Sequence, residues 1–104
     1  MSKTVAIVVF AGVQSLDVTG PMDVFSEANR FLAPEDHYRL EVIGVERGVM
    51  PCSNGLSLNA HRHFSEALGV YDLLLVAGGP QLPFMNFGPA FDAWLRDASA
   101  LAQR

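Results

Sequence analysis

The amino-acid sequence predicts an α/β fold: a doubly wound parallel sheet sandwiched by helices. Two predominantly apolar runs, at residues 5–10 (VAIVVF) and 71–77 (YDLLLVA, with Asp72 near its start), have the composition of strands that helices cover on both faces. Each run is followed by a glycine-containing loop and then by a segment with helical spacing. Strands that alternate with helices in this way pair in parallel through right-handed crossovers. We therefore expect residues 5–10 to form a central parallel strand.

The first helix and the second strand follow from local signals. After a loop at residues 11–20, Pro21 suits the first position of a helix that runs to about Arg30. That helix is expected to bury Met22, Phe25 and Ala28. A Pro-Glu-Asp break at 34–36 ends this unit, and the alternation over residues 38–45 predicts the second strand.

The remaining elements are shorter. Asn54-Gly55 is a strong signal for a two-residue turn, which predicts a hairpin of short strands. Residues 64–68 are expected to form a brief helical turn. A last helix is predicted from Pro89 to about Ala102, with one apolar face made of Phe91, Trp94, Leu95, Ala98, Leu101 and Ala102.

Composition limits the function classes. The chain has 104 residues, of which 50% are hydrophobic and 17% charged, so it is expected to be one compact unit rather than a disordered segment. A net charge of −4 without clustered Lys and Arg argues against a nucleic-acid-binding face. There is no apolar stretch of the roughly 18 residues that a membrane span needs, and no signal-peptide pattern. With a single cysteine, the sequence favours a cytoplasmic protein without membrane association.

Asp17 is the most informative side chain, because it lies between an apolar strand and a helix start. It is either a structural anion bound to backbone donors or the acid/base of a pocket at the carboxyl edge of the sheet. Gly78 and Gly79 directly follow the second apolar run, and their backbone can approach a ligand closely. Parallel strands place both loops at the same edge, so we expect Asp17, Gly78 and Gly79 to share one crevice.

An acid role for Asp17 near neutral pH has an energetic requirement. Its pKa would have to rise about two to three units above the usual value of about 3.9, at about 1.4 kcal/mol per unit. The helix dipole opposes this change by about 0.3 to 1 kcal/mol. Only apolar burial or a neighbouring anion can raise the pKa of Asp17 by this amount. Leu16, Val18 and Phe10 are the candidates for burial.

Three segments together carry a family resemblance: residues 5–10, 16–29 (LDVTGPMDVFSEAN) and 72–80 (DLLLVAGGP). They resemble the ThiJ/PfpI family, whose fold is the class I glutamine amidotransferase-like, flavodoxin-like sandwich. The resemblance is closest to the amidase-like sensor domain at the N-terminus of AraC-type transcriptional regulators and to the isocyanide hydratases. Family members commonly have proline where this chain has Ala77, a departure that affects the stiffness of the loop.

The resemblance implies two alternative functions. The first is a ligand-sensing, dimerising domain of an AraC-type regulator, which binds a small metabolite at Asp17, Gly78 and Gly79 and contacts DNA only through a C-terminal domain not in this chain. The second is a fragment of a cysteine-dependent enzyme such as an isocyanide hydratase, with Asp17 as acid/base and the glycine-loop amides stabilising negative charge. The segments at 23–29 and 54–58 are more similar to the regulator branch. An incomplete half-domain with neither activity is the third possibility.

The family's cysteine nucleophile follows a further strand, so the resemblance predicts that residues 1–104 are a single partial domain, the N-terminal portion only, that is not catalytic as it stands. Cys52 does not replace that nucleophile, and we interpret it as a small, partly buried apolar residue. His61 and His63 lack further ligands and are expected to be solvated loop residues, so no metal and no cofactor are predicted. An unpaired sheet edge and the apolar stripe around Trp94 favour a homodimer.

Overall fold

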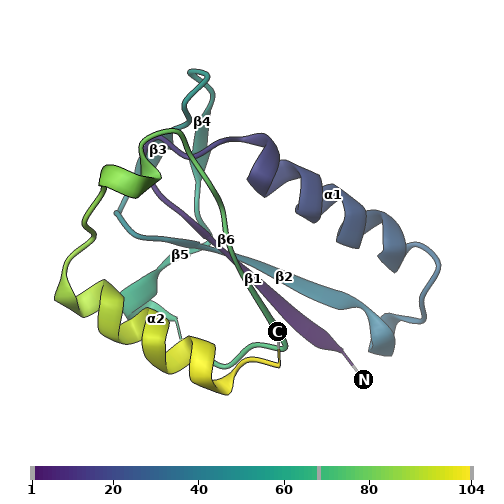
Figure 1. Ribbon diagram of the computed structural model, residues 1–104. Helices are drawn as coiled ribbons and strands as arrows, with labels where there is room; N and C mark the ends of the chain where they lie inside the picture. The colour runs from purple at the N-terminus through teal and green to yellow at the C-terminus, as the bar shows by residue number, and fades with distance from the viewer. Residues whose placement is uncertain (1, 68, 104) are drawn as a thin grey trace.

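The computed structural model describes residues 2–67 and 69–103 and consists of a four-stranded parallel sheet with one long helix on each face (Figure 1). The sheet has the order β5-β2-β1-β6. A separate antiparallel hairpin and three single 3-10 turns, at Pro34–Asp36, Phe64–Glu66 and Leu82–Phe84, complete the described part. The strands are β1 (Lys3–Val9), β2 (Tyr38–Gly44), β3 (Val49–Pro51), β4 (Ser57–Asn59), β5 (Arg62–His63) and β6 (Leu73–Val76), and the helices are α1 (Leu16–Asn29) and α2 (Pro89–Leu101).

Strand β1 is the central strand, as its apolar run predicts. It pairs in parallel with β2 on one side and with β6 on the other, so that Val5 lies beside both Leu40 and Leu73. Every residue from 5 to 10 is at most 1% exposed. Burial on both faces and pairing on both edges explain why this segment has no polar positions.

The structure is an α/β sandwich, because the two helices lie on opposite faces of the sheet. Figure 1 shows α1 on one side of the sheet and α2 on the other. Side chains alternate across a strand, so Val5 and Ile7 face the α1 side, whereas Ala6 packs with Ile43 and Tyr71 on the α2 side. The fold class predicted from the sequence is therefore confirmed.

The start of α1 corrects the sequence prediction. The helix begins at Leu16 rather than at Pro21, so Asp17 lies in its first turn and Pro21 lies inside it. The amide of Asp17 donates to the Gln14 carbonyl (3.1 Å), which closes the first turn ahead of the proline. Because Pro21 has no N–H, the carbonyl of Asp17 loses its i+4 donor. Contacts between Gln14 and the end of β6, described below, fix this turn.

Three other expectations are changed in detail. The hairpin forms, but residues 52–56 connect its strands instead of a two-residue turn. The Cys52 amide donates across this connection to the Leu56 carbonyl (2.6 Å), and Cys52 also forms a parallel bridge with Val13. Leu101 is not part of the buried face of α2, because it is 60% exposed, whereas Phe91 and Ala98 are buried. The predicted turn at 64–68 is seen as Phe64–Glu66, and Leu68 lies outside the described residues.

Helix α1 is only partly buried against the sheet. Val18 is its one buried residue in the described structure, and Met22, Phe25 and Ala28 are half-buried rather than buried. Asn29 anchors the end of the helix, because its Nδ2 donates to the Tyr38 carbonyl (2.9 Å) and its Oδ1 accepts from the Tyr38 amide (2.7 Å). This pair of hydrogen bonds aligns the end of α1 with the start of β2.

Candidate functional site

The candidate site lies at the carboxyl edge of the sheet, where β1 and β6 end. The amide of Gly78, two residues beyond β6, donates to Oδ2 of Asp17 at 3.0 Å. The amide of Gln14 donates to the Gly78 carbonyl at 2.8 Å. Two hydrogen bonds in opposite directions therefore join the segment after β1 to the segment after β6. The structure brings Asp17 and Gly78 together, as the parallel topology predicts.

The absence of a side chain at position 78 is required by this contact. A Cβ atom added to Gly78 would lie 2.8 Å from Oδ2 of Asp17, which is closer than real Cβ contacts. The carboxylate would have to move and would lose its present donor. Gly78 therefore permits the carboxylate to reach the backbone, which is a local reason for glycine here.

Gly79 is restricted for a different reason. A Cβ atom there would lie 2.8 Å from the Gly12 carbonyl oxygen and 3.2 Å from the ring of Phe10. Gly12 follows β1, so the two chain segments after β1 and β6 are packed backbone against backbone at this point. The glycine pair thus closes the space between the two loops and does so with main-chain atoms that cannot easily move.

Asp17 itself is solvent-exposed. Its neighbour Leu16 is 68% exposed, so it does not cover the carboxylate. Val18 and Phe10 are buried in the core. The apolar burial that the sequence suggested for Asp17 is therefore wrong for the described part of the chain.

A second carboxylate and the hairpin also support this edge of the sheet. Oε2 of Glu46 accepts from the Ala11 amide (3.1 Å), and Nδ2 of Asn54 donates to Oγ of Ser15 (3.0 Å). The Gly12 amide donates to the Pro51 carbonyl (2.8 Å). Local sequence spacing does not predict these roles for Glu46 and Ser15, since neither lies in a motif and their partners are more than thirty residues away.

Cys52 is buried, as expected, at 5% exposure. Burial raises the pKa of its thiol above the usual value. The thiolate is the nucleophilic form of cysteine, so a raised pKa keeps this side chain unreactive near neutral pH. Cys52 is the only cysteine in the sequence, and the chain therefore contains no activated thiol of its own.

His61 and His63, two of the three histidines, are held by the backbone. His61 is exposed and its Nδ1 accepts from the Val42 amide at 2.8 Å, whereas His63 lies in β5 rather than in a loop. Nε2 of His63 lies 3.1 Å from the Val45 carbonyl, so the expectation of a solvated loop residue is wrong for His63. In residues 2–67 and 69–103, no group of three or more His, Cys, Asp or Glu side chains is arranged to hold a metal ion.

Comparison with known sequences identifies the family. The sequence model of the DJ-1/PfpI family matches residues 3–100. The chain belongs to the DJ-1/PfpI family. A protein of Streptomyces lividans, described as an uncharacterized protein in the cpoL 5' region, is 36% identical over 100 residues, which cover 96% of this chain and 68% of that protein.

Solved structures of the family have the same fold. A ThiJ/PfpI family protein from Pseudomonas syringae superposes with a TM-score of 0.81 at 16% identity, over 99% of this chain and 40% of that one. An AraC family transcriptional regulator from Pseudomonas putida has a TM-score of 0.75 at 26% identity, over 94% and 59%. Oxidized DJ-1 from Toxoplasma gondii has a TM-score of 0.73 at 20% identity, over 94% and 50%.

These comparisons also define how much of each relative is covered. The chain spans 40% to 59% of the length of these three solved proteins.

Within the described residues, neither helix is long and apolar enough to cross a membrane.

Proposed function

We propose that this chain is the ligand-sensing N-terminal domain of an AraC-type transcriptional regulator, and that it dimerises in the cytoplasm and is not catalytic as it stands. The observation that carries the proposal is the 26% identity to the AraC family regulator from Pseudomonas putida over 94% of the chain. The net charge of −4 supports assigning DNA contact to a different domain. A small metabolite is the expected ligand.

In this proposal the ligand binds where Asp17 and the Gly78-Gly79 segment meet. A metabolite that donated a hydrogen bond to Asp17 or accepted one from the Gly78 amide would compete with their present hydrogen bond. That hydrogen bond joins the start of α1 to the end of β6, so competition would change how firmly the two segments are held together. Binding becomes a signal if the ligand has a higher affinity for the arrangement without the hydrogen bond between Asp17 and Gly78 than for the arrangement with it.

The state of Cys52 supports a role without catalysis. Its thiol is buried and its pKa is raised by that burial, so it does not supply the thiolate that a cysteine-dependent reaction uses. The exposed carboxylate of Asp17 therefore has no thiolate partner in this chain.

The second candidate function is part of a cysteine-dependent enzyme such as an isocyanide hydratase. The observation that favours it is the state of the Asp17 carboxylate, where Oδ2 accepts from Gly78 and Oδ1 has no partner within the described residues. Oδ1 is then available for proton transfer. The reaction adds one water molecule to the terminal carbon of an isocyanide and gives an N-substituted formamide.

One pair of assays on the natural gene product separates the two candidates. Binding to a promoter fragment from its own locus is measured by fluorescence anisotropy, and hydration of phenyl isocyanide is followed by formation of the formamide. The proposal expects DNA binding without turnover, and the same DNA affinity in the Asp17→Ala variant. Turnover that is lost in Asp17→Asn, together with no DNA binding, would overturn the proposal and establish the enzyme.

A separate measurement tests dimerisation. Sedimentation equilibrium of the purified chain is expected to show a mass twice that of the monomer at micromolar concentration. A stable monomer at high concentration contradicts this part of the proposal, and it leaves the choice between regulator and enzyme to the first pair of assays.

A further inference from the structure

We propose that Asn54 deamidates spontaneously in the folded chain with the help of the Ser15 hydroxyl, and that the isoaspartate formed there weakens the attachment of the β3–β4 hairpin to the loop before α1. Asn54 is followed by Gly55 in the connection between the two strands. All contacts that carry the proposal lie within residues 12–56, and none of them involves Asp17. The proposal therefore does not depend on the function proposed above.

The chemistry is an intramolecular substitution at the side-chain amide of Asn54. The backbone nitrogen of Gly55 attacks Cγ and loses its proton, a proton is added to Nδ2, and the bond between Cγ and Nδ2 breaks to release ammonia. The product is a five-membered succinimide. Solvent water then adds to one of its two carbonyl carbons and opens the ring to aspartate or to isoaspartate. In isoaspartate the main chain continues through Cγ and is one methylene longer.

Gly55 leaves the attacking nitrogen accessible. Its φ is +91°, a conformation that glycine adopts readily. Apart from its chain neighbours, no described atom lies within 4 Å of the position that a Cβ would occupy. The Gly55 amide donates to the Cys52 carbonyl (3.0 Å), so this hydrogen bond must open before the attack. Opening at an exposed loop tip costs little free energy.

Both ends of the Asn54 amide are held in positions that favour the reaction. Oδ1 accepts from the Leu56 amide (3.0 Å), which draws electron density from Cγ and makes this carbon easier to attack. Nδ2 lies 3.0 Å from Oγ of Ser15. Once Gly55 has attacked, Nδ2 becomes basic, and the Ser15 hydroxyl can turn and pass a proton to it as it leaves.

The attachment of the hairpin consists of three hydrogen bonds to residues 12–15. The Gly12 amide donates to the Pro51 carbonyl (2.8 Å), and the Ser53 amide donates to the Val13 carbonyl (2.9 Å). The bond from Nδ2 of Asn54 to Ser15 is the third. Deamidation removes the donor of this third bond.

Isoaspartate also disturbs the connection itself. The Cys52 amide donates to the Leu56 carbonyl at 2.6 Å, so residues 52–56 form a tight closure. An additional main-chain atom at position 54 changes the span from Cys52 to Leu56, and the closure cannot keep its present geometry. The neighbouring hydrogen bond from Ser53 to Val13 is therefore expected to open more often.

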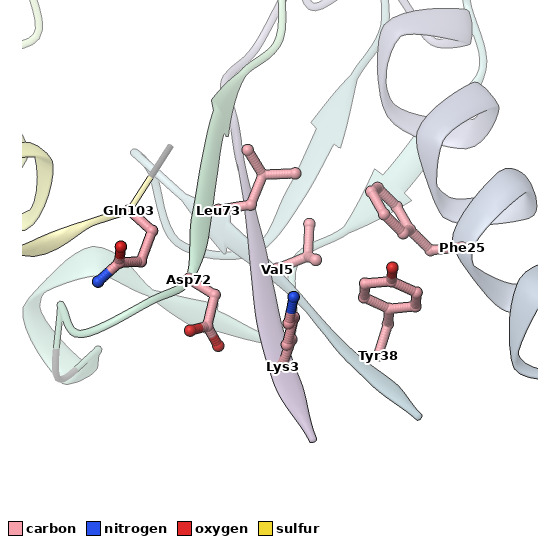
Figure 2. A pocket seen from close by; sticks show the side chains of 7 residues that line it. All are labelled: Lys3, Val5, Phe25, Tyr38, Asp72, Leu73 and Gln103. Carbon is pink, nitrogen blue, oxygen red and sulfur yellow. The ribbon is translucent and has the colours of Figure 1, made fainter. Parts of the chain in front are cut away.

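The remaining asparagines serve as internal controls, because the residue after each of them carries a side chain that crowds the attacking nitrogen. They are Asn29, Asn59 and Asn86. Asn29 is also locked in place, since Oδ1 and Nδ2 both bind the Tyr38 backbone. Figure 2 shows the ring of Tyr38 against that of Phe25 from α1, with centroids 4.8 Å apart. This packing holds the Asn29 amide where no neighbouring nitrogen can attack it.

The first experiment incubates the purified 104-residue chain at neutral pH and follows it by peptide mass spectrometry and by methylation with an isoaspartate-specific methyltransferase. Asn54 is expected to react at least about tenfold faster than any other asparagine, because only its attacking nitrogen is unhindered. Asn54→Gln should stop the reaction, since the longer side chain would require a six-membered ring. Asn59→Gln is the matched control and should leave the rate unchanged.

The role of Ser15 is tested with Ser15→Ala. This variant should slow the reaction of Asn54 severalfold in the folded chain. In urea, where Ser15 and Asn54 are no longer in contact, the variant and the wild type should react at the same rate.

The second experiment measures amide hydrogen exchange in the isoaspartate form, which ion exchange isolates because deamidation adds one negative charge to the net charge of −4. The Ser53 amide is expected to exchange at least about fivefold faster than in the unmodified chain, a factor equivalent to the loss of one hydrogen bond. The Ile7 amide in β1 should be unchanged. Asn54→Asp keeps the length of the main chain and should show a smaller effect at Ser53.

Four results contradict the proposal. An Asn54 that stays intact while the urea-unfolded chain is converted would mean that the native connection protects the amide. Equal rates at Asn54 and at the other asparagines would remove the preference for this site. An unchanged rate in folded Ser15→Ala would exclude the proton transfer from Ser15. Equal exchange of the Ser53 amide in both forms would mean that isoaspartate leaves the attachment intact.

Discussion

Oδ2 of Asp17 lies 3.0 Å from the amide nitrogen of Gly78, although the two residues are 61 positions apart in the chain. The contact joins the first turn of α1 to the segment that leaves β6. With the hydrogen bond from the Gln14 amide to the Gly78 carbonyl, it holds the carboxyl ends of two neighbouring strands in one arrangement. The same carboxylate is exposed to solvent.

Gly78→Ala is expected to break this contact, because its Cβ would lie 2.8 Å from Oδ2 of Asp17. The loss should be about 0.5 to 1.5 kcal/mol, the range for one hydrogen bond. Urea unfolding measures it. In the double variant Asp17→Ala/Gly78→Ala the clash is gone, so the two effects should be less than additive. Additive losses would contradict the pairing of these two residues.

Gly79→Ala should cost more than Gly78→Ala, about 1 to 3 kcal/mol, because overpacking here meets a backbone oxygen and an aromatic ring. Gly20→Ala is the control. A Cβ at Gly20 meets only Leu16 Cδ1 at 3.8 Å, and alanine favours a helix, so stability should be unchanged or raised. An equal loss in all three variants would refute the packing derived for the carboxyl edge.

Asn29→Ala should destabilise the protein by about 1 to 3 kcal/mol, because it removes both hydrogen bonds to the Tyr38 backbone in a half-buried position. Asn29→Asp should recover part of the loss, since a carboxylate can still accept from the Tyr38 amide. Ser26→Ala, an exposed change on the same helix, is the control. Thermal unfolding of the three variants is the measurement, and a loss for Ser26→Ala as large as that for Asn29→Ala would refute the anchor.

Tyr71 is expected to set an alkaline limit to stability. Burial, with the nearby Glu41 carboxylate as a second cause, raises the pKa of Tyr71 to about 12 from 10.0. A raised pKa in the folded state contributes stability that is present below pH 10 and is lost as the pH rises towards 12. Urea unfolding from pH 9 to 11.5 should show a steeper decline for the wild type than for Tyr71→Phe. Parallel declines in the two proteins would contradict this effect.

Cys52 is expected to react slowly with iodoacetamide at pH 8. The thiol is buried and its pKa is raised by burial, so alkylation should be at least about tenfold slower than in the chain unfolded in urea. The double variant Cys52→Ala/Ser53→Cys moves the thiol to the exposed neighbouring position and should react rapidly. If the native thiol reacts as fast as this control, Cys52 is accessible and its interpretation as a core residue fails.

The sequence predicted the features that depend on composition along one strand or one helix. The central position of β1 follows from its six consecutive apolar residues, because a continuous apolar run is typical of a strand that is buried on both faces. The proximity of Asp17 to Gly78 follows from topology, since parallel strands end at one edge. These predictions needed no knowledge of individual tertiary contacts.

Features set by long-range hydrogen bonds could not be predicted in this way. Pro21 is a local signal for a helix start, but Gln14 and Asp17 are fixed by Gly78, and the helix therefore begins earlier. The hairpin connection is longer than the two residues that Asn54-Gly55 predicts, and Cys52 at its start also contacts the distant Val13. Glu46 accepts a hydrogen bond from the Ala11 amide, 35 positions away, and local spacing along the sequence does not predict such a contact.

The pairing of Val5 with Leu73 has a consequence for synthesis on the ribosome. The second edge of β1 stays without a partner until 68 further residues have been translated, the difference between 73 and 5, which takes about 3 to 14 seconds at about 5 to 20 residues per second. During this interval the most apolar strand can already pair with β2 and still presents one bare edge. Chaperone binding and premature association compete with folding in this interval, and slower translation prolongs it.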